Sequence, residues 1–370
     1  MSTEGNLDTV QMLVNMGPQH PSTHGVFRMI LWVDGERVVD MEPHIGYLHR
    51  GSEKLCEGEL YAQIVTLFDR MDYISNLNNE MVFCRAVEKL TDIAVPERAE
   101  YIRVILCELN RVASHLLFFG TFGIDAGAMT PIMYTFRDRE KIQSMFEAVT
   151  GARMMHNYIR IGGVKEDLPD DFIERMATLT NHLRQGIEEC DSLLSSNEMF
   201  LERTKGVGII GPDDAINYGL SGPCLRASGV LEDVRISEPY SFYNRFDFGI
   251  PVGADGDCWD RYYVRVEEMR QSLRIIDQAM DQMEPGPITA KVRRLIRPPK
   301  GEVYARTESP RGDLGIFLVS DGTDKPYRVK VRAPSFANLQ AIQHMLKDAY
   351  VADAVIILGS LDIILGEVDR

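Results

Sequence analysis

Hydrophobic and polar residues alternate near the start of the chain, with the period of two that is typical of half-buried strands. Segments 9–15, 27–33 and 37–42 show this alternation, and the turn Asp34-Gly35 separates the last two. The loop 17–25 reads Gly-Pro-Gln-His-Pro-Ser-Thr-His-Gly, and its prolines and glycines exclude a helix. The pattern predicts a small antiparallel sheet with a shaped, exposed loop at one end.

From about Glu53 the spacing of hydrophobic residues changes to three and four, which predicts helices. One helix is expected to begin at Pro96 and to run to Gly120. Another has apolar side chains from Tyr262 to Met283 at alternating spacings of four and three, the seam of a packed bundle. Further helices are predicted at 57–90, 137–150 and 170–194. A bundle of long helices is therefore the expected core.

After Pro298 the pattern becomes mixed. It predicts strands at 302–306, 315–319, 327–331 and 355–358, and a helix at 335–347. The whole chain is interpreted as an α+β fold, mostly helical. Its expected parts are an N-terminal antiparallel sheet with the exposed loop (1–52), a helical bundle core (53–297) and a mixed α/β C-terminal part packed on that core (298–370).

Composition narrows the class of protein. The chain has 370 residues, of which 45% are hydrophobic, enough for a sizeable core. The net charge is −15, and no cluster of basic residues could neutralise a row of phosphates, so nucleic acid is not an expected partner. The first nine residues are polar, and no apolar run reaches the roughly 20 residues of a spanning helix. We expect a cytoplasmic chain without a transmembrane segment, so any membrane association would come through partner subunits.

Six cysteines are scattered along the chain, without a Cys-x-x-Cys pair. Cysteines with this distribution are usually small buried side chains in a cytosolic protein. Neither a disulfide framework nor a cysteine-bound cluster is predicted.

A match to the Gly-x-Gly-x-x-Gly pattern of dinucleotide sites occurs at 206–211. Such a site requires a buried strand before the pattern and a helix that begins within it. Here the charged stretch 201–205 precedes the pattern, and Asp213 and Asp214 follow it, where they would repel phosphate. A plain turn is the preferred interpretation.

Four histidines occur early, as His20-x-x-x-His24 and His44-x-x-x-x-His49. Zinc sites use such spacings, but no cysteine lies close enough in sequence to complete a common structural site. The preferred interpretation is that of polar histidines near a reaction site, where an imidazole on a loop can donate a proton near neutral pH.

Two carboxylates stand in unusual surroundings. Asp72-Tyr73 falls in a predicted helix that is polar for a segment flanked by apolar runs, so it is either a solvent-facing or subunit-facing surface or a functional patch. Asp125 follows an aromatic and glycine-rich stretch at the end of a buried helix. It is either a capping or turn residue or a carboxylate with a dedicated partner.

Longer motifs at 17–25, 44–51, 157–163, 225–229 and 327–334 occur in one order along the chain. Together they closely resemble the quinone-site large subunit of NADH:quinone oxidoreductase, the respiratory complex I. The resemblance extends from about residue 10 to the last residue, which makes it far more specific than any short pattern above.

That family is similar to the large subunit of nickel-iron hydrogenases, which hold their metals with one cysteine pair near the start and another at the end. In this chain the two pairs fall at Asp72 and Ser75 and at Ile364 and Glu367. A nickel-iron site requires soft thiolate ligands. The resemblance therefore implies a hydrogenase large-subunit-like fold without a metal and without a cofactor bound by this chain alone.

In place of the metal, the resemblance implies a quinone headgroup as the substrate. Tyr73 and His24 match its ligands and proton donors, and Asp125 matches the carboxylate that partners the histidine. Thr121 and His20 match further members of the pocket. Reduction of a quinone by two electrons requires two protons, which a tyrosine and an imidazole at opposite ends of the ring can supply.

The resemblance also implies a place in a larger machine. The chain is expected to be a peripheral-arm subunit of a proton-pumping oxidoreductase, on the cytoplasmic side of the cell membrane and inactive alone. Expected partners are an iron-sulfur subunit similar to the hydrogenase small subunit, another peripheral-arm subunit and a membrane subunit lining the quinone channel. NAD and the iron-sulfur clusters would be bound by partner subunits. The alternative function is a non-catalytic scaffold that bridges the electron-transfer and membrane modules.

Two departures from the family pattern bear on docking. The segment 287–299 is shorter than in many relatives, and Asp362-Ile363 lacks a proline that is common at that step. Neither touches the implied quinone ligands. Both bear on which peripheral subunits dock, and hence on whether NADH, ferredoxin or another donor supplies the electrons.

Overall fold

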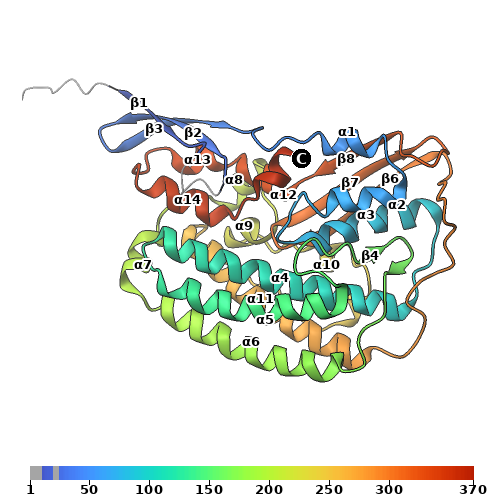
Figure 1. Cartoon of the computed structure of the whole chain (residues 1–370). Coiled ribbons are helices and arrows are strands. Elements are labelled where there is room, and N and C mark those ends of the chain that lie inside the picture. The colour runs from blue at the N-terminus through green and yellow to red at the C-terminus, as the bar shows by residue number, and fades with distance from the viewer. Residues whose placement is uncertain (1–10, 20–24) are drawn as a thin grey trace, which may run out of the picture.

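Long helices lie beneath two three-stranded antiparallel sheets in the computed structural model, which describes residues 11–19 and 25–370 (Figure 1), and β4 and β5 form a small two-stranded pair. The strands are β1 Met12–Met16, β2 Arg28–Asp34, β3 Arg37–His44, β4 Ile159–Arg160, β5 Gly163–Val164, β6 Gly301–Ser309, β7 Gly312–Ser320 and β8 Arg328–Arg332. The helices up to the middle of the chain are α1 Ser52–Cys56, α2 Tyr61–Phe68, α3 Asn76–Thr91, α4 Glu97–Asp125, α5 Thr130–Thr150, α6 Phe172–Leu194 and α7 Glu198–Thr204. The later ones are α8 Pro212–Asn217, α9 Gly222–Ala227, α10 Val234–Ser237, the 3-10 turn η2 Tyr243–Arg245, α11 Cys258–Gln282, α12 Pro334–Leu339, α13 Ile342–Leu346, α14 Asp353–Leu361 and α15 Leu365–Asp369. The α+β, mostly helical fold predicted from the sequence is confirmed.

The N-terminal sheet has the order β1-β2-β3, with antiparallel pairs throughout. Met29, Leu31 and Val33 of β2 are buried and alternate with half-buried neighbours, as the period of two requires. The loop after α13 continues the pairing at the edge, where Asp348 N donates to Val38 O at 2.9 Å. The predicted sheet is confirmed within the described residues, which begin at residue 11.

Helices α4, α5, α6 and α11 form the bundle, in which α4 packs against α5 and α11. The predicted helices at 96–120, 137–150, 170–194 and 262–283 are all present, although α4 and α5 are longer than predicted. Rings from three helices meet in the core: the Tyr262 centroid lies 5.2 Å from that of Phe119 and 5.0 Å from that of Phe200. Such contacts between rings stabilise the bundle by more than the burial of their apolar surface alone.

The single helix predicted at 57–90 is wrong, because the chain breaks between α2 and α3. Asp72 Oδ1 accepts hydrogen bonds from Ile74 N at 3.2 Å and Ser75 N at 3.1 Å. This short side chain therefore takes backbone donors that a continuous helix would use. Asp72 and Tyr73 consequently lie in a buried turn and not on a helix surface.

The predicted strand at 355–358 is also wrong, since these residues lie in α14. A short apolar run is ambiguous between a strand and a helix buried on all sides. Helix α14 is buried along most of its length, with α4, α11, α12 and α13 around it. The helix predicted at 335–347 is divided into α12 and α13.

The second sheet has the predicted strands in the order β6-β7-β8, and α3 packs against β6 and β7. The turn between β6 and β7 approaches α9 so closely that a Cβ on Gly222 would lie 2.3 Å from the Gly312 Cα atom. This backbone contact fixes the position of Arg311, which precedes Gly312 in the turn.

Buried ion pairs fill the space between the bundle and the second sheet. Arg226 of α9 contacts Glu268 of α11 at 2.5 Å and Glu308 of β6 at 2.9 Å, and all three side chains are buried. Burial alone would raise the pKa of Glu268, but Arg226 and His115 lower it below its ordinary value. These pairs bind α9, α11 and β6 to one another through charge-assisted hydrogen bonds. Among the described residues, none of the helices is long and apolar enough to cross a bilayer.

The close approach at Gly222 predicts a difference between two glycine substitutions. Gly222 and Gly35 have almost the same φ, 61° and 62°, but nothing lies within 4 Å of a Cβ on Gly35. Gly35→Ala is expected to cost about 1–2 kcal/mol from the backbone conformation alone. Gly222→Ala is expected to cost at least about twice as much, because the Cβ also overlaps the backbone at Gly312. Urea denaturation of the full chain measures both, and equal losses would contradict the prediction.

Candidate functional site

Tyr73 lies in the turn 69–75 between α2 and α3, where its side chain is half-buried. The turn rests on α4, since Asn110 Nδ2 donates to Ile74 O at 2.9 Å and Asn110 Oδ1 accepts from Leu77 N at 3.2 Å. Burial raises the pKa of Tyr73 above its ordinary value, and the neighbouring Asp72 raises it further, against the effect of Arg311. The phenol is therefore protonated at neutral pH and can donate a hydrogen bond.

The side chain of Arg311 forms hydrogen bonds that connect this turn to neighbouring segments. Its Nη1 atom donates to Asp72 Oδ2 at 2.7 Å and to Ser114 Oγ of α4 at 3.1 Å. Its Nε atom donates to Asp362 O at 3.0 Å, and Nη2 reaches Asp362 Oδ1 at 3.4 Å. Arg311 and Asp72 are each about 1% exposed. One buried guanidinium thus connects the Tyr73 turn, α4, the β6–β7 turn and the C-terminal segment.

The C-terminal segment closes the other side of the turn. A Cβ on Gly366 would lie 2.7 Å from Met71 O, so only a glycine allows the approach. The next residue, Glu367, is buried and accepts a hydrogen bond from Ser335 N at 3.1 Å. Burial raises the pKa of Glu367 to about 7, and the nearby Asp72 contributes to the shift. Burial also raises the pKa of Asp72, which Arg311 only partly offsets.

The residues at the hydrogenase ligand positions do not fit a nickel-iron centre. Asp72, Ser75 and Glu367 are buried there with hard oxygen atoms, and Ile364 has no ligand atom. The described part of the chain holds no group of three or more His, Cys, Asp or Glu side chains placed to share a metal ion. Asp72 instead forms an ion pair with Arg311.

The six cysteines are all buried and unpaired in disulfides, as the sequence predicts. Burial raises the pKa of Cys56 and of Cys190 to about 12, so both thiols are protonated. These thiols are parts of the core and do not form a cluster site.

Thr121 and Asp125 lie further along the same helix that supports the Tyr73 turn. Both are half-buried near the end of α4, and Thr121 Oγ1 donates to Leu117 O at 3.0 Å. Ser114, which contacts Arg311, precedes them by seven and eleven residues. At 1.5 Å per residue, Thr121 and Asp125 lie roughly 10 Å and roughly 16 Å beyond Ser114 along the helix axis. Steps of seven and eleven residues are close to two and three helical turns, so both predicted site residues lie on nearly the same face of α4 as Ser114.

The remaining predicted site residues, His20 and His24, lie outside the described residues. The other early histidines have separate partners: His44 Nε2 lies 3.3 Å from Glu42, and His49 Nδ1 bonds with Asp369 O at 2.7 Å. These two side chains do not converge as a zinc site would require.

The glycine pattern at 206–211 lacks the context of a dinucleotide site. Helix α7, and not a strand, precedes it. Side chains from other helices instead contact the backbone of this turn: Arg261 Nη2 donates to Gly208 O at 2.7 Å, and Ile357 lies against Gly208. The expected plain turn is confirmed.

Arg311, Asp362 and Ser114 were not identified from the sequence as members of the site. They are far apart along the chain, and Arg311 stands in a short hairpin turn where an arginine is usually exposed. The only local signal is Gly312 after Arg311, whose φ of 129° marks a special backbone position.

The long-helix bundle, the two small sheets and the buried residues at the four ligand positions define a protein of the hydrogenase large-subunit-like class without the metal centre. Residues 125–298 and 291–370 match the family described as respiratory-chain NADH dehydrogenase, 49 Kd subunit. The chain is 52% identical over 363 residues to a NADH-quinone oxidoreductase subunit of Desulforamulus reducens, covering 98% of this chain and 99% of that protein. It is 50% identical over 370 residues to the equally named subunit of Clostridium beijerinckii, with 100% of each chain covered. It is 51% identical to the equally named subunit of Bacillus mycoides, over 98% of this chain and 99% of that protein.

The three relatives match 98% or 100% of the chain, the family model matches it from residue 125 onward, and all indicate one family. The protein belongs to the 49 Kd subunit family of respiratory-chain NADH dehydrogenases, and it is one component of an oxidoreductase complex.

The Arg311 contacts predict a pH-dependent loss of stability in Arg311→Gln. At neutral pH the variant leaves Asp72 buried without its cation, which is expected to cost about 3–5 kcal/mol, whereas Asp362 keeps Arg265 at 3.8 Å. Loss of the guanidinium raises the pKa of Asp72 further, so the native variant binds a proton that the unfolded chain does not. Its stability therefore falls as pH rises, and the difference from the wild type is larger at about pH 8 than at about pH 5.

Arg328→Gln is the matched control, since Arg328 pairs with Glu57 at 3.0 Å but is 46% exposed. It is expected to change stability by less than about 0.5 kcal/mol. Urea denaturation at both pH values measures the two variants. A pH-independent loss in Arg311→Gln would show that the guanidinium does not compensate the carboxylates.

Proposed function

We propose that this chain forms the quinone site of a multi-subunit NADH:quinone oxidoreductase, in which Tyr73 and His24 bind the two carbonyl ends of the headgroup. The observation that carries the proposal is that Asp72, at one of the metal-ligand positions, forms an ion pair with Arg311. This ion pair fixes the turn in which the protonated Tyr73 lies. Full-length identity of about half to proteins named as NADH-quinone oxidoreductase subunits supports it.

The residue types suit the reaction. When a quinone takes up two electrons, negative charge develops on both carbonyl oxygens, and two protons are needed to form the quinol. The Tyr73 hydroxyl would donate a hydrogen bond to one oxygen and His24 to the other. Asp125, at the end of α4, would hold the imidazole of His24 in the orientation for donation. Thr121 and His20 would line the same pocket.

Electrons would come from a partner subunit. The cysteines of this chain are buried and scattered, so an iron-sulfur cluster in a neighbouring iron-sulfur subunit is the proposed donor. The other proposed partners are a second peripheral-arm subunit and a membrane subunit that lines the route of the quinone. The chain would then sit peripherally on the cytoplasmic side of the membrane, where NAD is bound by a different subunit.

Proton donation would also start the coupling to proton pumping. Loss of protons from Tyr73 and His24 leaves negative charge near buried groups, and Asp125 together with the Asp72–Arg311–Asp362 contacts could respond by changing position. Such a local electrostatic change can bias a larger conformational change in the complex.

Donor-driven reduction of a short-chain quinone by the intact membrane complex tests the site. Tyr73→Phe removes one hydroxyl and keeps the ring, so the complex is expected to assemble with activity about 100-fold lower, the loss typical of a positioned proton donor. Tyr263→Phe on α11, where the side chain is 40% exposed, is the matched control and is expected to retain full activity.

Assembly is measured in parallel by the amount of this chain in the purified complex. Full activity of an assembled Tyr73→Phe complex would contradict the proposed role of Tyr73. It would favour the scaffold function, in which the chain only bridges the electron-transfer and membrane modules.

A further inference from the structure

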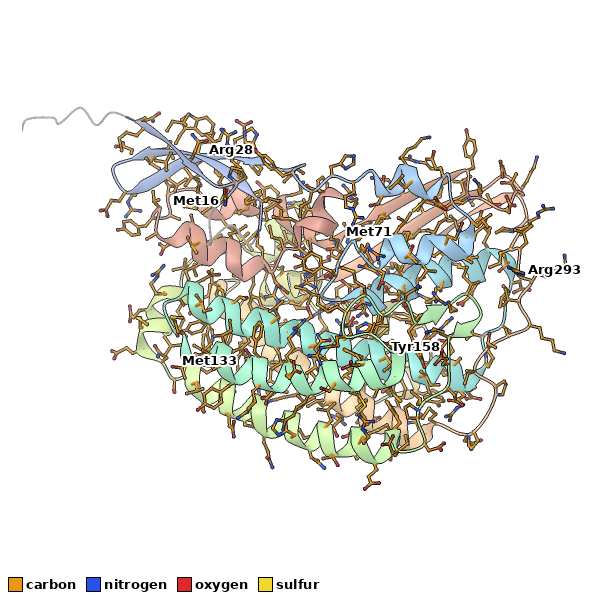
Figure 2. All side chains as sticks on the ribbon, viewed as in Figure 1. Met16, Arg28, Met71, Met133, Tyr158 and Arg293 are labelled. Carbon is orange, nitrogen blue, oxygen red and sulfur yellow. The ribbon has the colours of Figure 1, made fainter. Side chains whose placement is uncertain are left out.

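The turn that carries Tyr73 is closed at its base by a cluster of buried polar side chains. Asp69 follows the last residue of α2, and Asn76 is the first residue of α3. Asn76 Nδ2 donates to Asp69 Oδ1 at 2.7 Å, so one hydrogen bond joins the two ends of the turn. Met71, labelled near the centre of Figure 2, belongs to the same turn.

Glu80, one helical turn after Asn76, completes the cluster. Its Oε2 atom accepts hydrogen bonds from Tyr158 N at 2.8 Å and Ile159 N at 2.7 Å, and its Oε1 atom lies 3.3 Å from Asn76 Nδ2. Asn76 Nδ2 thus bonds to one oxygen of each carboxyl and brings the two acids together, while the other oxygen of Asp69, Oδ2, is buried without a hydrogen-bond donor in the part of the chain that the structure describes. Asp69 and Glu80 are both completely buried.

Two buried carboxyls that share one amide donor favour a proton on one of them. Two carboxylates are acceptors only, and two such charges side by side in a buried site repel each other. Burial raises the pKa of Glu80 well above its ordinary value, and Asp69 raises it further. The imidazole of His156, which lies 2.9 Å from Asn76 Nδ2, does not supply a positive charge, because burial lowers its pKa to about 4.

The cations on the elements that pack against α3 are committed elsewhere. On α4, Arg103 pairs with Glu88 and Arg111 pairs with Glu108. Arg160 of β4 bonds to Asn157. Arg306 of β6 pairs with Glu238 and Asp313. Among the buried acids on these elements, Glu108 contacts Arg235 and Glu308 contacts Arg226. In the loop before β4, Arg153 pairs with Glu140. Within the described residues, the Asp69 and Glu80 carboxyls therefore have each other and no arginine or lysine.

We propose that Asp69 and Glu80 share one proton, and that this proton keeps the Tyr73 turn closed in the position that binds the headgroup. The two acids are positioning residues that act through Tyr73, so the proposal rests on the proposed function.

Its pH dependence follows from the direction of the pKa shift. A carboxyl whose pKa is raised in the native protein keeps its proton below that raised value and loses it as pH rises through it. Loss of the proton puts two carboxylates against each other at the base of the turn, where the neutral amide of Asn76 cannot compensate two negative charges. Closure of the turn is therefore complete at lower pH and is lost toward alkaline pH.

The test is the KM for a short-chain quinone in the intact membrane complex, measured from about pH 6 to about pH 9 in the wild type, Glu80→Gln and Tyr73→Phe. In the wild type, KM is expected to rise at the alkaline end of the range. Glutamine keeps an N–H donor toward Asp69 that cannot ionise in this range, so Glu80→Gln is expected to assemble, to match the wild type at the acidic end and to lack the alkaline rise.

Glu88→Gln, two turns further along α3, is the matched control, because Glu88 is a buried partner of Arg103 at 2.6 Å. The same chemical change there removes a charge that is needed, so this variant is expected to assemble poorly at every pH. The proposal is overturned if Glu80→Gln assembles as poorly as Glu88→Gln, or if its KM follows the wild type across the range.

Failure of this proposal and failure of the proposed function are distinguishable. If Tyr73→Phe abolishes activity while Glu80→Gln and the wild type share one pH profile, the shared-proton proposal fails and the quinone site stands. If assembled Tyr73→Phe is fully active, the quinone site itself fails.

Discussion

A single buried guanidinium, that of Arg311, determines how the centre of this protein is assembled. It neutralises Asp72 and Asp362 from segments almost 300 residues apart and also bonds to α4 through Ser114. Each of these carboxylates would be costly to bury without a cation. The close backbone approach of Gly222 to Gly312 fixes the position of the neighbouring Arg311. The position of the turn that carries Tyr73 therefore depends on how α9 packs against the β6–β7 turn.

Much of the fold could be predicted because the long elements have unambiguous periods. The four bundle helices and the six strands of the two larger sheets follow from spacings of three and four or of two. The errors occur where local contacts outweigh the pattern. The backbone bonds of the Asp72 side chain interrupt a helical period, and α14 is apolar on all sides because helices surround it. Neither cause is visible in a window of a dozen residues.

The candidate site was only partly predictable. Tyr73, Thr121 and Asp125 could be identified because they stand in motifs that match a family residue by residue. Arg311 and Glu80 could not, because their importance depends on which carboxyl lies beside each of them. The sequence shows 55 acidic side chains but not which are paired with arginine and which are paired with another acid. Only the three-dimensional arrangement separates Glu88, which has Arg103, from Glu80, which has Asp69.

The burial of every native cysteine has a practical consequence. A thiolate is the reactive form of the side chain; burial blocks access at all six positions, and it raises the pKa of Cys56 and of Cys190 to about 12. A cysteine introduced at an exposed position, such as Met133 on α5 with 70% of its side chain accessible, would be the single reactive thiol of this chain. A spin label or fluorophore attached there would report distances to partner subunits without removal of any native cysteine, so motion in the assembled complex could be measured from this chain.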